Sequence, residues 1–153
     1  MYVIGNSLKG QIESKAMSFT QPARVLSHHG VLAMLAAAVA EAERIGQPQC
    51  IVIGDASGVT LGALRMTGAK FHTVRSARAK AQTAASTGAP SSAIPAELRP
   101  LIGLATEGAV TGLPGGLPIR RDGVVVGGLG IGSGAGDRDV AVARAALAAV
   151  GAD

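Results

Sequence analysis

The sequence predicts an α/β protein of the α+β type, in which helices cover the faces of an antiparallel sheet. Hydrophobic residues make up 48% of the 153 residues and charged residues only 16%, which is typical of a chain with a folded core. Two apolar regions are each split by a short turn sequence, DASG (55–58) and RRDG (120–123), as in β-hairpins. Segments with apolar residues at helical spacing precede, separate and follow these hairpins.

A single domain is expected over residues 20–153, after an N-terminal extension of residues 1–19, because a chain of this length fills one core. Residues 1–20 lack the continuous apolar stretch of a signal peptide, and no run approaches the ~18 residues of a membrane span. We therefore expect a cytoplasmic protein without a membrane partner. Only 2% of the residues are aromatic, so the core must use small aliphatic side chains, which favours further burial by self-association.

The first long helix is predicted within residues 20–48. Thr20 is a candidate N-cap and Pro22 suits an early helical position, while Gly46 and Pro48 predict the end of the helix. The apolar residues that recur at helical spacing, and so form the expected buried stripe, are Val25, Leu32, Leu35, Val39 and Ala42.

Residues 49–66 are predicted to form a hairpin around the DASG turn, followed by a second helix within residues 68–87. The run from Cys50 to Ile53 is apolar on both faces, so its strand is expected in the centre of a covered sheet. Cys50 is the sole cysteine and is expected to be a small buried hydrophobe. The second helix is marked by apolar residues at spacings of three and four: Val74, Ala77, Ala81 and Ala84.

The C-terminal part is expected to contain a long loop, two or three strands and a last helix. Residues 88–116 are expected to form the loop, with one short helix near residues 96–105, and the RRDG turn joins two strands. Alternation in the outgoing strand gathers glycines on one face, so a helix or a ligand must press against them. These glycines are Gly128, Gly130 and Gly132. The last helix is marked by Asp137 and Asp139 at its start and by the stripe Val140, Ala143, Leu147 and Val150.

The charge pattern does not indicate nucleic-acid binding. The net charge is +4 and the sequence pI is about 9.8, but basic residues are scattered singly and aromatic residues for base stacking are nearly missing. A basic balance suits an anionic small ligand. The glycine-rich region near the C-terminus lacks the spacing and position of a dinucleotide fingerprint. Zinc-like Cys/His spacing and a GxSxG serine are also missing, so neither a metal site nor classical hydrolase chemistry is expected.

The sequence resembles the GlcG/HbpS-like family, which includes the C-terminal domain of PduO-type proteins. The resemblance covers about residues 22–150 and rests on DASG, RMTGA (65–69), KAQTA (80–84) and GGLPI (115–119). It implies a profilin-like α/β/α sandwich with a central five-stranded antiparallel sheet, assembled into a dimer or a larger homo-oligomer such as an octamer. Some members of this family bind haem, and others are linked to haem degradation, redox sensing or corrinoids. Thr67 departs from the family pattern, which often has an acidic residue there.

Two histidines are candidate axial ligands if the ligand is haem, as the resemblance suggests. His28 and His29 are adjacent in the first predicted helix, so their side chains should point about 100° apart and cannot both bind one metal ion through the same helical face. The alternative is that one histidine lies on the polar flank and the other packs at an interface.

An anionic-ligand site is expected where the second helix, Arg65 and the GGLPI segment meet. His72, Ser76 and Lys80 follow one another at four-residue spacing, which aligns an imidazole, a hydroxyl and an ammonium group along one ridge. Lys80 would bind a carboxylate together with Arg65, whose guanidinium can hold it through two hydrogen bonds. A solvated helix face explains the ridge equally well, and Arg65 could instead form a structural pair with Asp55.

Three residues of the second hairpin region would contribute to the same site. Arg120 follows the GGLPI segment as a further cation, and Gly115 and Gly116 could present backbone N–H groups to a ligand oxygen. Tight hairpin packing is the alternative explanation for the two glycines.

The sequence leaves three functions open. The first is a homo-oligomeric small-molecule-binding protein with an anionic ligand, either haem or another tetrapyrrole. The second is a catabolic enzyme that acts on a small carboxylate or an oxygenated ring, with His72 or Asp55 as the acid–base group and Arg65 and Lys80 as an anion clamp. The third is a structural partner for other subunits, which needs no pocket.

Overall fold

The computed structural model describes residues 19–152, so the predicted extension lies outside the described residues except for Phe19. Within this range the chain forms four strands, four α-helices and two short 3-10 helices. In order, the elements are α2 (His28–Arg44), β1 (Cys50–Asp55), β2 (Thr60–Arg65), α3 (Thr73–Thr87), η1 (Ser91–Ala93), η2 (Ala96–Leu98), α4 (Arg99–Ala105), β3 (Gly116–Arg121), β4 (Val124–Gly132) and α5 (Gly136–Ala148).

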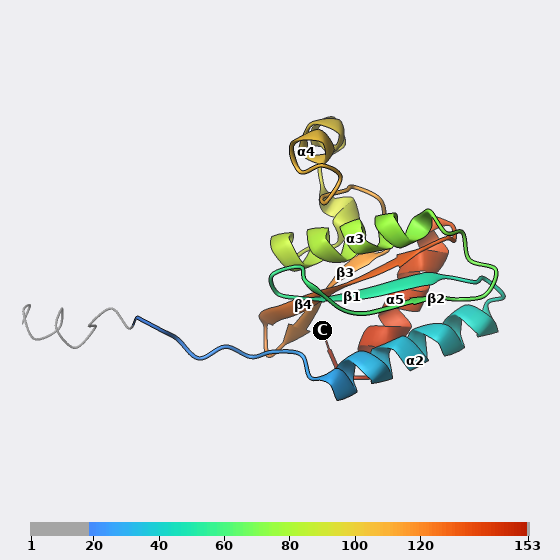
Figure 1. Cartoon of the computed structure of the whole chain (residues 1–153), viewed down its shortest axis with the longest axis horizontal. Coiled ribbons are helices and arrows are strands. Elements are labelled where there is room, and N and C mark those ends of the chain that lie inside the picture. Colours follow the sequence, from blue (N-terminus) through green and yellow to red (C-terminus); the bar gives the residue numbers. More distant parts are fainter. Residues whose placement is uncertain (1–18, 153) are drawn as a thin grey trace, which may run out of the picture.

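The strands form one antiparallel sheet in the order β2-β1-β4-β3. Helix α3 covers one face of this sheet, and α2 and α5 cover the other (Figure 1). The predicted α+β class, its layers and the central position of β1 are therefore confirmed. The expected fifth strand is corrected, since the described residues contain four strands. Residues 106–115 form no strand, and the N–H groups of residues 106–108 bond back to α4, as in the 2.7 Å bond from the Gly108 N–H to the Gly103 carbonyl oxygen.

Helix α2 begins at His28, eight residues after the predicted N-cap. Ser27 caps it, with a side-chain oxygen that accepts a 3.2 Å hydrogen bond from the Gly30 N–H. Residues 20–27 stay irregular, and Arg24 in this segment forms an ion pair with Asp122 in the β3–β4 turn. The predicted stripe is confirmed for Ala42, which is buried, and Leu35 and Val39 pack against the core. It is wrong for Leu32 and Val25, which are 61% and 82% exposed. The residues that α2 buries are Val31, Met34, Ala38 and Ala42.

The predicted glycine face of β4 packs directly against α3. A Cβ atom on Gly130 would overlap the carbonyl oxygen of Ala77, and one on Gly128 would overlap that of Ala81. Cys50 and Val52 of β1 lie on the same side of the sheet as these helical alanines. This face of β4 therefore has no side chains, and that lets a helix approach closely. Of the two neighbours that the sequence allowed, a helix or a ligand, the structure shows the helix.

Both predicted hairpins are present. In the first turn, Asp55 accepts hydrogen bonds from the N–H groups of Ser57 (2.8 Å) and Val59 (3.0 Å) through one carboxylate oxygen. In the second turn, Asp122 and Gly123 have φ values of 51° and 75°, the left-handed pair that a two-residue hairpin loop requires.

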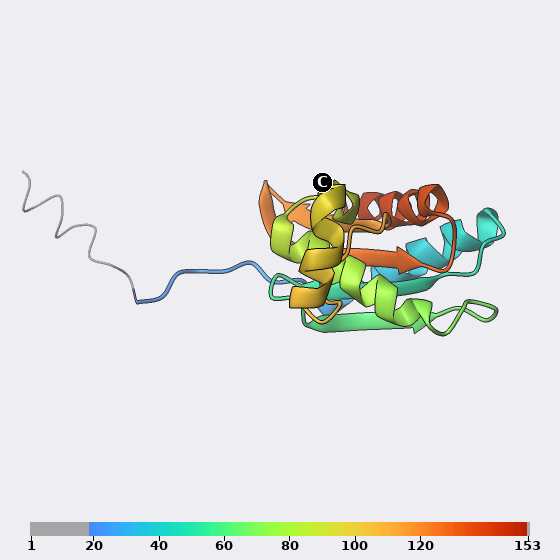
Figure 2. The ribbon, with the colours of Figure 1, turned by 90° about the horizontal axis from the view of Figure 1, so that it is seen from above.

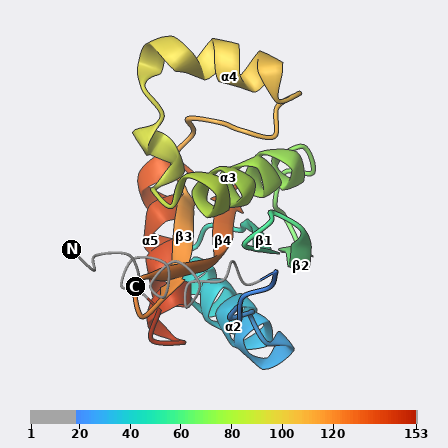
Figure 3. The same ribbon diagram turned by 90° about the vertical axis from the view of Figure 1, so that its left-hand side faces the viewer.

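Helix α4 stands away from the sandwich. It lies beyond α3 in Figures 1 and 3 and crosses above α3 in Figure 2. It buries none of its own residues, and Leu101 and Leu104 are 65% and 82% exposed. The short helix predicted near residues 96–105 is confirmed, and it presents an apolar surface to solvent.

Candidate functional site

Lys80 is held inside the protein. Its ammonium group lies 2.7 Å from the Asp139 carboxylate of α5 and 2.6 Å from the Ile131 carbonyl oxygen of β4, and the residue is only 4% exposed. The other Asp139 carboxylate oxygen accepts a 3.0 Å hydrogen bond from the Gly134 N–H. The structure therefore gives Lys80 the role of a buried ion pair that ties α3 to α5, in place of the anion clamp expected from the sequence.

Gly115 and Gly116 are also engaged by the protein. The Gly116 N–H donates to the Ser91 hydroxyl oxygen at 3.0 Å, and the Gly115 carbonyl accepts from the Ile131 N–H at 2.9 Å. A Cβ atom on Gly115 would lie 2.7 Å from the Asp139 Cβ. Close packing around the buried ion pair therefore accounts for both glycines.

The predicted site residues that belong to the strands lie at opposite ends of the sheet. Arg65 pairs with Cys50 at one end, whereas Asp55 pairs with Gly127 at the other. Arg120 lies at the Asp55 end, where it faces Val125 of β4. At about 3.3 Å per residue along a strand, these ends are roughly 20 Å apart. The structure therefore brings Arg65 together with neither Asp55 nor Arg120.

His72 and Ser76 do not form a continuous ridge with Lys80. His72 is exposed at the start of α3, with its ring near Phe71, whereas Lys80 points into the interior. The Ser76 hydroxyl donates a 3.0 Å hydrogen bond to the Thr73 carbonyl oxygen. Asp55, the other predicted acid–base residue, uses its carboxylate to close the first turn. This geometry does not favour the catabolic-enzyme hypothesis.

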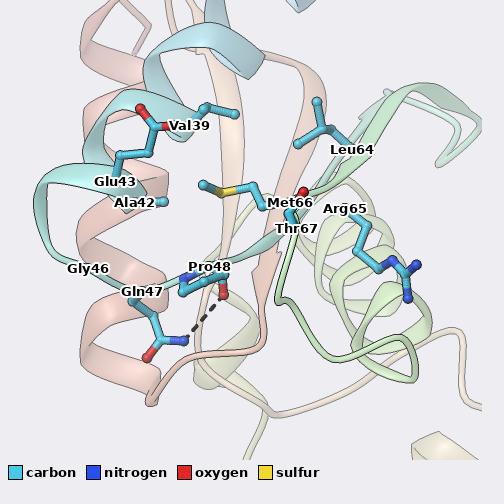
Figure 4. Close-up of a pocket in the computed structure, with 10 residues that line it drawn as sticks. All are labelled: Val39, Ala42, Glu43, Gly46, Gln47, Pro48, Leu64, Arg65, Met66 and Thr67. Atoms are coloured by element: carbon cyan, nitrogen blue, oxygen red, sulfur yellow. Dashed lines mark hydrogen bonds between the residues drawn. The ribbon is translucent and has the colours of Figure 1, made fainter.

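Arg65 lines a pocket of about 580 Å³ between the ends of α2 and β2 (Figure 4). Figure 4 shows Val39, Leu64 and Met66 pointing toward one another, while the Arg65 guanidinium points away from them. Glu43 supplies the acidic side chain of this pocket. A ligand in this pocket would therefore contact the carboxylate of Glu43, and the guanidinium of Arg65 would not point at it. This arrangement does not suit an anionic ligand.

Arg44 and Glu41 of α2 form an ion pair with each other. Arg44 donates two hydrogen bonds of 2.7 Å to the Glu41 carboxylate, and these bonds hold the pKa of that carboxyl below its usual range. The two groups therefore bind each other and leave Glu43 as the acidic group that lines the pocket of Figure 4.

A second pocket, which we call the arginine pocket, lies beside the start of α2 and has a volume of about 370 Å³. This volume falls within the range of about 300–1,000 Å³ that is usual for small-molecule sites. Its described lining contains no acidic residue. The basic lining residues are Arg24, Arg120 and Arg121, and the larger apolar ones are Val25, Leu26, Met34, Ile119, Val126 and Val150.

The arginines of this pocket differ in how they are held. Arg24 is paired with Asp122, so its charge is balanced. Arg120 donates to the carbonyl oxygens of Gly123 at 3.0 Å and Gly88 at 2.5 Å, which fixes its guanidinium. Arg121 makes a long 3.4 Å hydrogen bond to the Gly151 carbonyl. Because a carbonyl carries no net charge, the positive charges of Arg120 and Arg121 are not balanced by a hydrogen-bonded carboxylate of residues 19–152.

His28 and His29 are the first two residues of α2 and are both exposed. Their ring centroids are only 4.0 Å apart, with a tilt of 40° between the planes, so the rings lie side by side in spite of the 100° helical step. Ser27 and Gly30, which flank them in the chain, line the arginine pocket. His28 and His29 are therefore neighbours in the chain of two pocket-lining residues, and neither histidine is itself part of the pocket lining.

Sequence reasoning missed Arg24, Arg121 and the burial of Asp139. Arg24 and Arg121 come from segments almost a hundred residues apart, and only the second hairpin turn brings them together. The tandem arginines of RRDG were the available signal. Across residues 19–152, no group of three His, Cys, Asp or Glu side chains is placed to hold a metal ion. The helices in the same range are all too short or too polar to cross a membrane.

The chain is a small α/β domain, and the arginine pocket has a volume in the range usual for small-molecule sites. The chain belongs to the HbpS-like family, since the sequence model described as "Haem degrading protein HbpS-like" matches residues 26–148. The GlcG/HbpS-like resemblance noted from the sequence is thereby confirmed.

Three relatives illustrate the range of this family. The corrinoid adenosyltransferase PduO of Citrobacter freundii is 33% identical over 135 residues, which cover 85% of this chain but only 40% of that protein. A crystal structure of a PduOC–haem complex matches with a TM-score of 0.79 and 29% identity, over 85% of this chain and 98% of that one. A double mutant of Streptomyces reticuli HbpS matches with a TM-score of 0.76 and 32% identity, over 84% and 89% of the two chains.

Proposed function

We propose that the protein binds haem or another tetrapyrrole in the arginine pocket, with His28 or His29 as the axial ligand of the iron. The observation that carries the proposal is a largely apolar pocket in which Arg120 and Arg121 have no carboxylate partner among residues 19–152. Two exposed imidazoles at the start of α2 stand next in the chain to the lining residues Ser27 and Gly30. A related structure is a haem complex by its own description, which supports the same ligand class.

The chemistry of these groups fits a tetrapyrrole. Such a ligand is a flat apolar ring with charged side chains. The accessible apolar lining residues Val25, Leu26 and Val150 supply surface that its ring could cover. A haem iron supplies a Lewis-acidic centre, and histidine is a usual axial ligand for it. On this chain, the exposed imidazole of His28 or His29 would donate a nitrogen lone pair to the iron.

Haem titration of the full chain tests the proposal. We expect a sharpened and shifted Soret band with the wild-type protein. The double variant His28→Ala/His29→Ala should weaken the apparent Kd by about tenfold or more, because the iron loses its nitrogen ligand. His72→Ala removes the remaining histidine, which lies at the start of α3, and serves as the matched control.

The control variant should keep the wild-type spectrum and affinity. A wild-type protein that leaves the Soret band of free haem unchanged would overturn the proposed function. An unchanged spectrum in the double variant would show that another group holds the iron.

The proposed function also includes a homo-oligomer. A seven-residue helix is marginal by itself in water, yet α4 has no fully buried residue and exposes Leu101 and Leu104. We expect a second copy of the chain to cover this surface. Sedimentation of the full chain should give a dimer or a larger species, and Leu101→Glu/Leu104→Glu should lower the oligomer size. A monomeric wild-type protein at tens of micromolar would contradict this expectation.

A further inference from the structure

We infer that the ligand of the arginine pocket carries at least two carboxylate groups, bound by Arg121 and Arg144 on two sides of an apolar body. This inference rests on the proposed function and names the chemical class that the site selects. It favours tetrapyrroles with free carboxylates, such as haem, and disfavours esters and corrinoids whose side chains are amides.

A third pocket adjoins the arginine pocket. It has a volume of about 420 Å³ and shares Arg120 and Ala152 with its neighbour. Arg144 of α5 is the additional cation in its lining. The other lining residues are mostly apolar or glycine: Gly88, Pro90, Leu117, Pro118, Leu147 and Ala148. A ligand that extended past the shared residues Arg120 and Ala152 would contact both linings.

Among the residues that the structure describes, neither lining contains an aspartate or a glutamate. The nearby carboxylate of Asp122 is already paired with Arg24. Among residues 19–152, the Arg144 side chain has no hydrogen-bond or ion-pair partner, and Arg121 has only the long bond to a carbonyl oxygen. Like charges gathered at one end of a domain repel one another, and a bound anion relieves this repulsion. The adjoining pockets therefore select a negatively charged ligand.

The positions of the arginines indicate why more than one carboxylate is needed. Arg120, shared by both pockets, is fixed to the Gly88 and Gly123 carbonyls and acts as a positioning residue that holds the β3–β4 turn against the end of α3. Arg121 lines only the arginine pocket and Arg144 only the adjoining one. A ligand with a single carboxylate would leave one of these two guanidinium groups without a partner.

The test compares haem with haem dimethyl ester, in which both carboxylates are blocked, on the full-length wild-type chain. We expect haem to bind at least about tenfold more tightly than the ester, since a hydrogen bond to a charged group contributes roughly this much. The double variant Arg121→Gln/Arg144→Gln should weaken haem binding by about tenfold or more and remove the preference over the ester. Arg75→Gln/Arg78→Gln on α3 makes the same change of charge elsewhere and should shift the Kd by less than twofold.

The outcomes separate the inference from the proposed function. If haem and its ester bind the wild-type protein equally well, the inference is overturned while tetrapyrrole binding stands. If both double variants weaken haem binding equally, general charge attraction explains the preference and the inference is also overturned. If neither haem nor its ester binds, both the proposed function and the inference are overturned. The ester comparison uses only the wild-type chain, so it decides the question even if a variant folds poorly.

Discussion

Gly130→Ala is expected to lower the stability of the protein by about 3 kcal/mol or more, at the upper end of what overpacking costs. The added Cβ would overlap the Ala77 carbonyl oxygen and lie 2.7 Å from the Ala81 backbone nitrogen. Both are backbone atoms of α3, so no side-chain rotation can relieve the clash. The helix must move away from the sheet, which loosens the packing of Cys50 and Val52 as well.

Thermal unfolding followed by circular dichroism measures this effect. A loss of 3 kcal/mol in a domain of this size corresponds to a fall in Tm of about 10 °C. Gly103→Ala on α4 is the matched control, because its Cβ would meet nothing closer than 3.8 Å. A Gly130→Ala protein that unfolds within two degrees of the control would contradict the close approach of α3 and β4.

Lys80→Ala is the second substitution with a large expected effect. It would leave the Asp139 carboxylate, whose side chain is 3% exposed, buried without its cation. Breaking a buried ion pair from one side costs about 3–5 kcal/mol. We therefore expect a fall in Tm of about 10 °C or more. Lys70→Ala makes the same change at an exposed lysine and should alter the stability by less than about 0.5 kcal/mol.

A double variant distinguishes the ion pair from simple loss of packing. In Lys80→Met/Asp139→Leu, both charges are replaced by apolar side chains, a change that is often neutral for a buried pair. The Gly134 N–H would keep the Gln49 side-chain oxygen as a partner at 3.1 Å. The double variant should therefore recover most of the lost stability. If it is less stable than Lys80→Ala, the charges themselves are not the source of the effect.

The local patterns of the sequence predicted the central part of the fold well. The turn residues predicted both hairpins, and both are present. The alternating glycines of β4 predicted a closely packed neighbour, which is α3. The start of α2 was missed because Thr20 and Ser27 are both good N-caps. The choice between them depends on packing and on the pairing of Arg24 with Asp122, 98 residues away, which no local pattern contains.

The site was harder to predict than the fold for the same reason. The four-residue spacing of His72, Ser76 and Lys80 is real, but burial decides what Lys80 does, and its partner Asp139 is 59 residues away. Asp139 was expected only to complement the dipole of the last helix. The arginine pocket depends on three segments that meet in space, namely the lead-in to α2, the β3–β4 hairpin and the end of the chain beyond α5.

The position of iron in a crystal of the haem complex tests the central claim most directly. Anomalous scattering at the iron edge locates the metal without reference to the rest of the map. The proposed site predicts one iron peak within bonding distance of a His28 or His29 ring nitrogen, with the macrocycle over the arginine pocket. An iron peak in the pocket of Figure 4, beside Met66 and Leu64, would contradict the account.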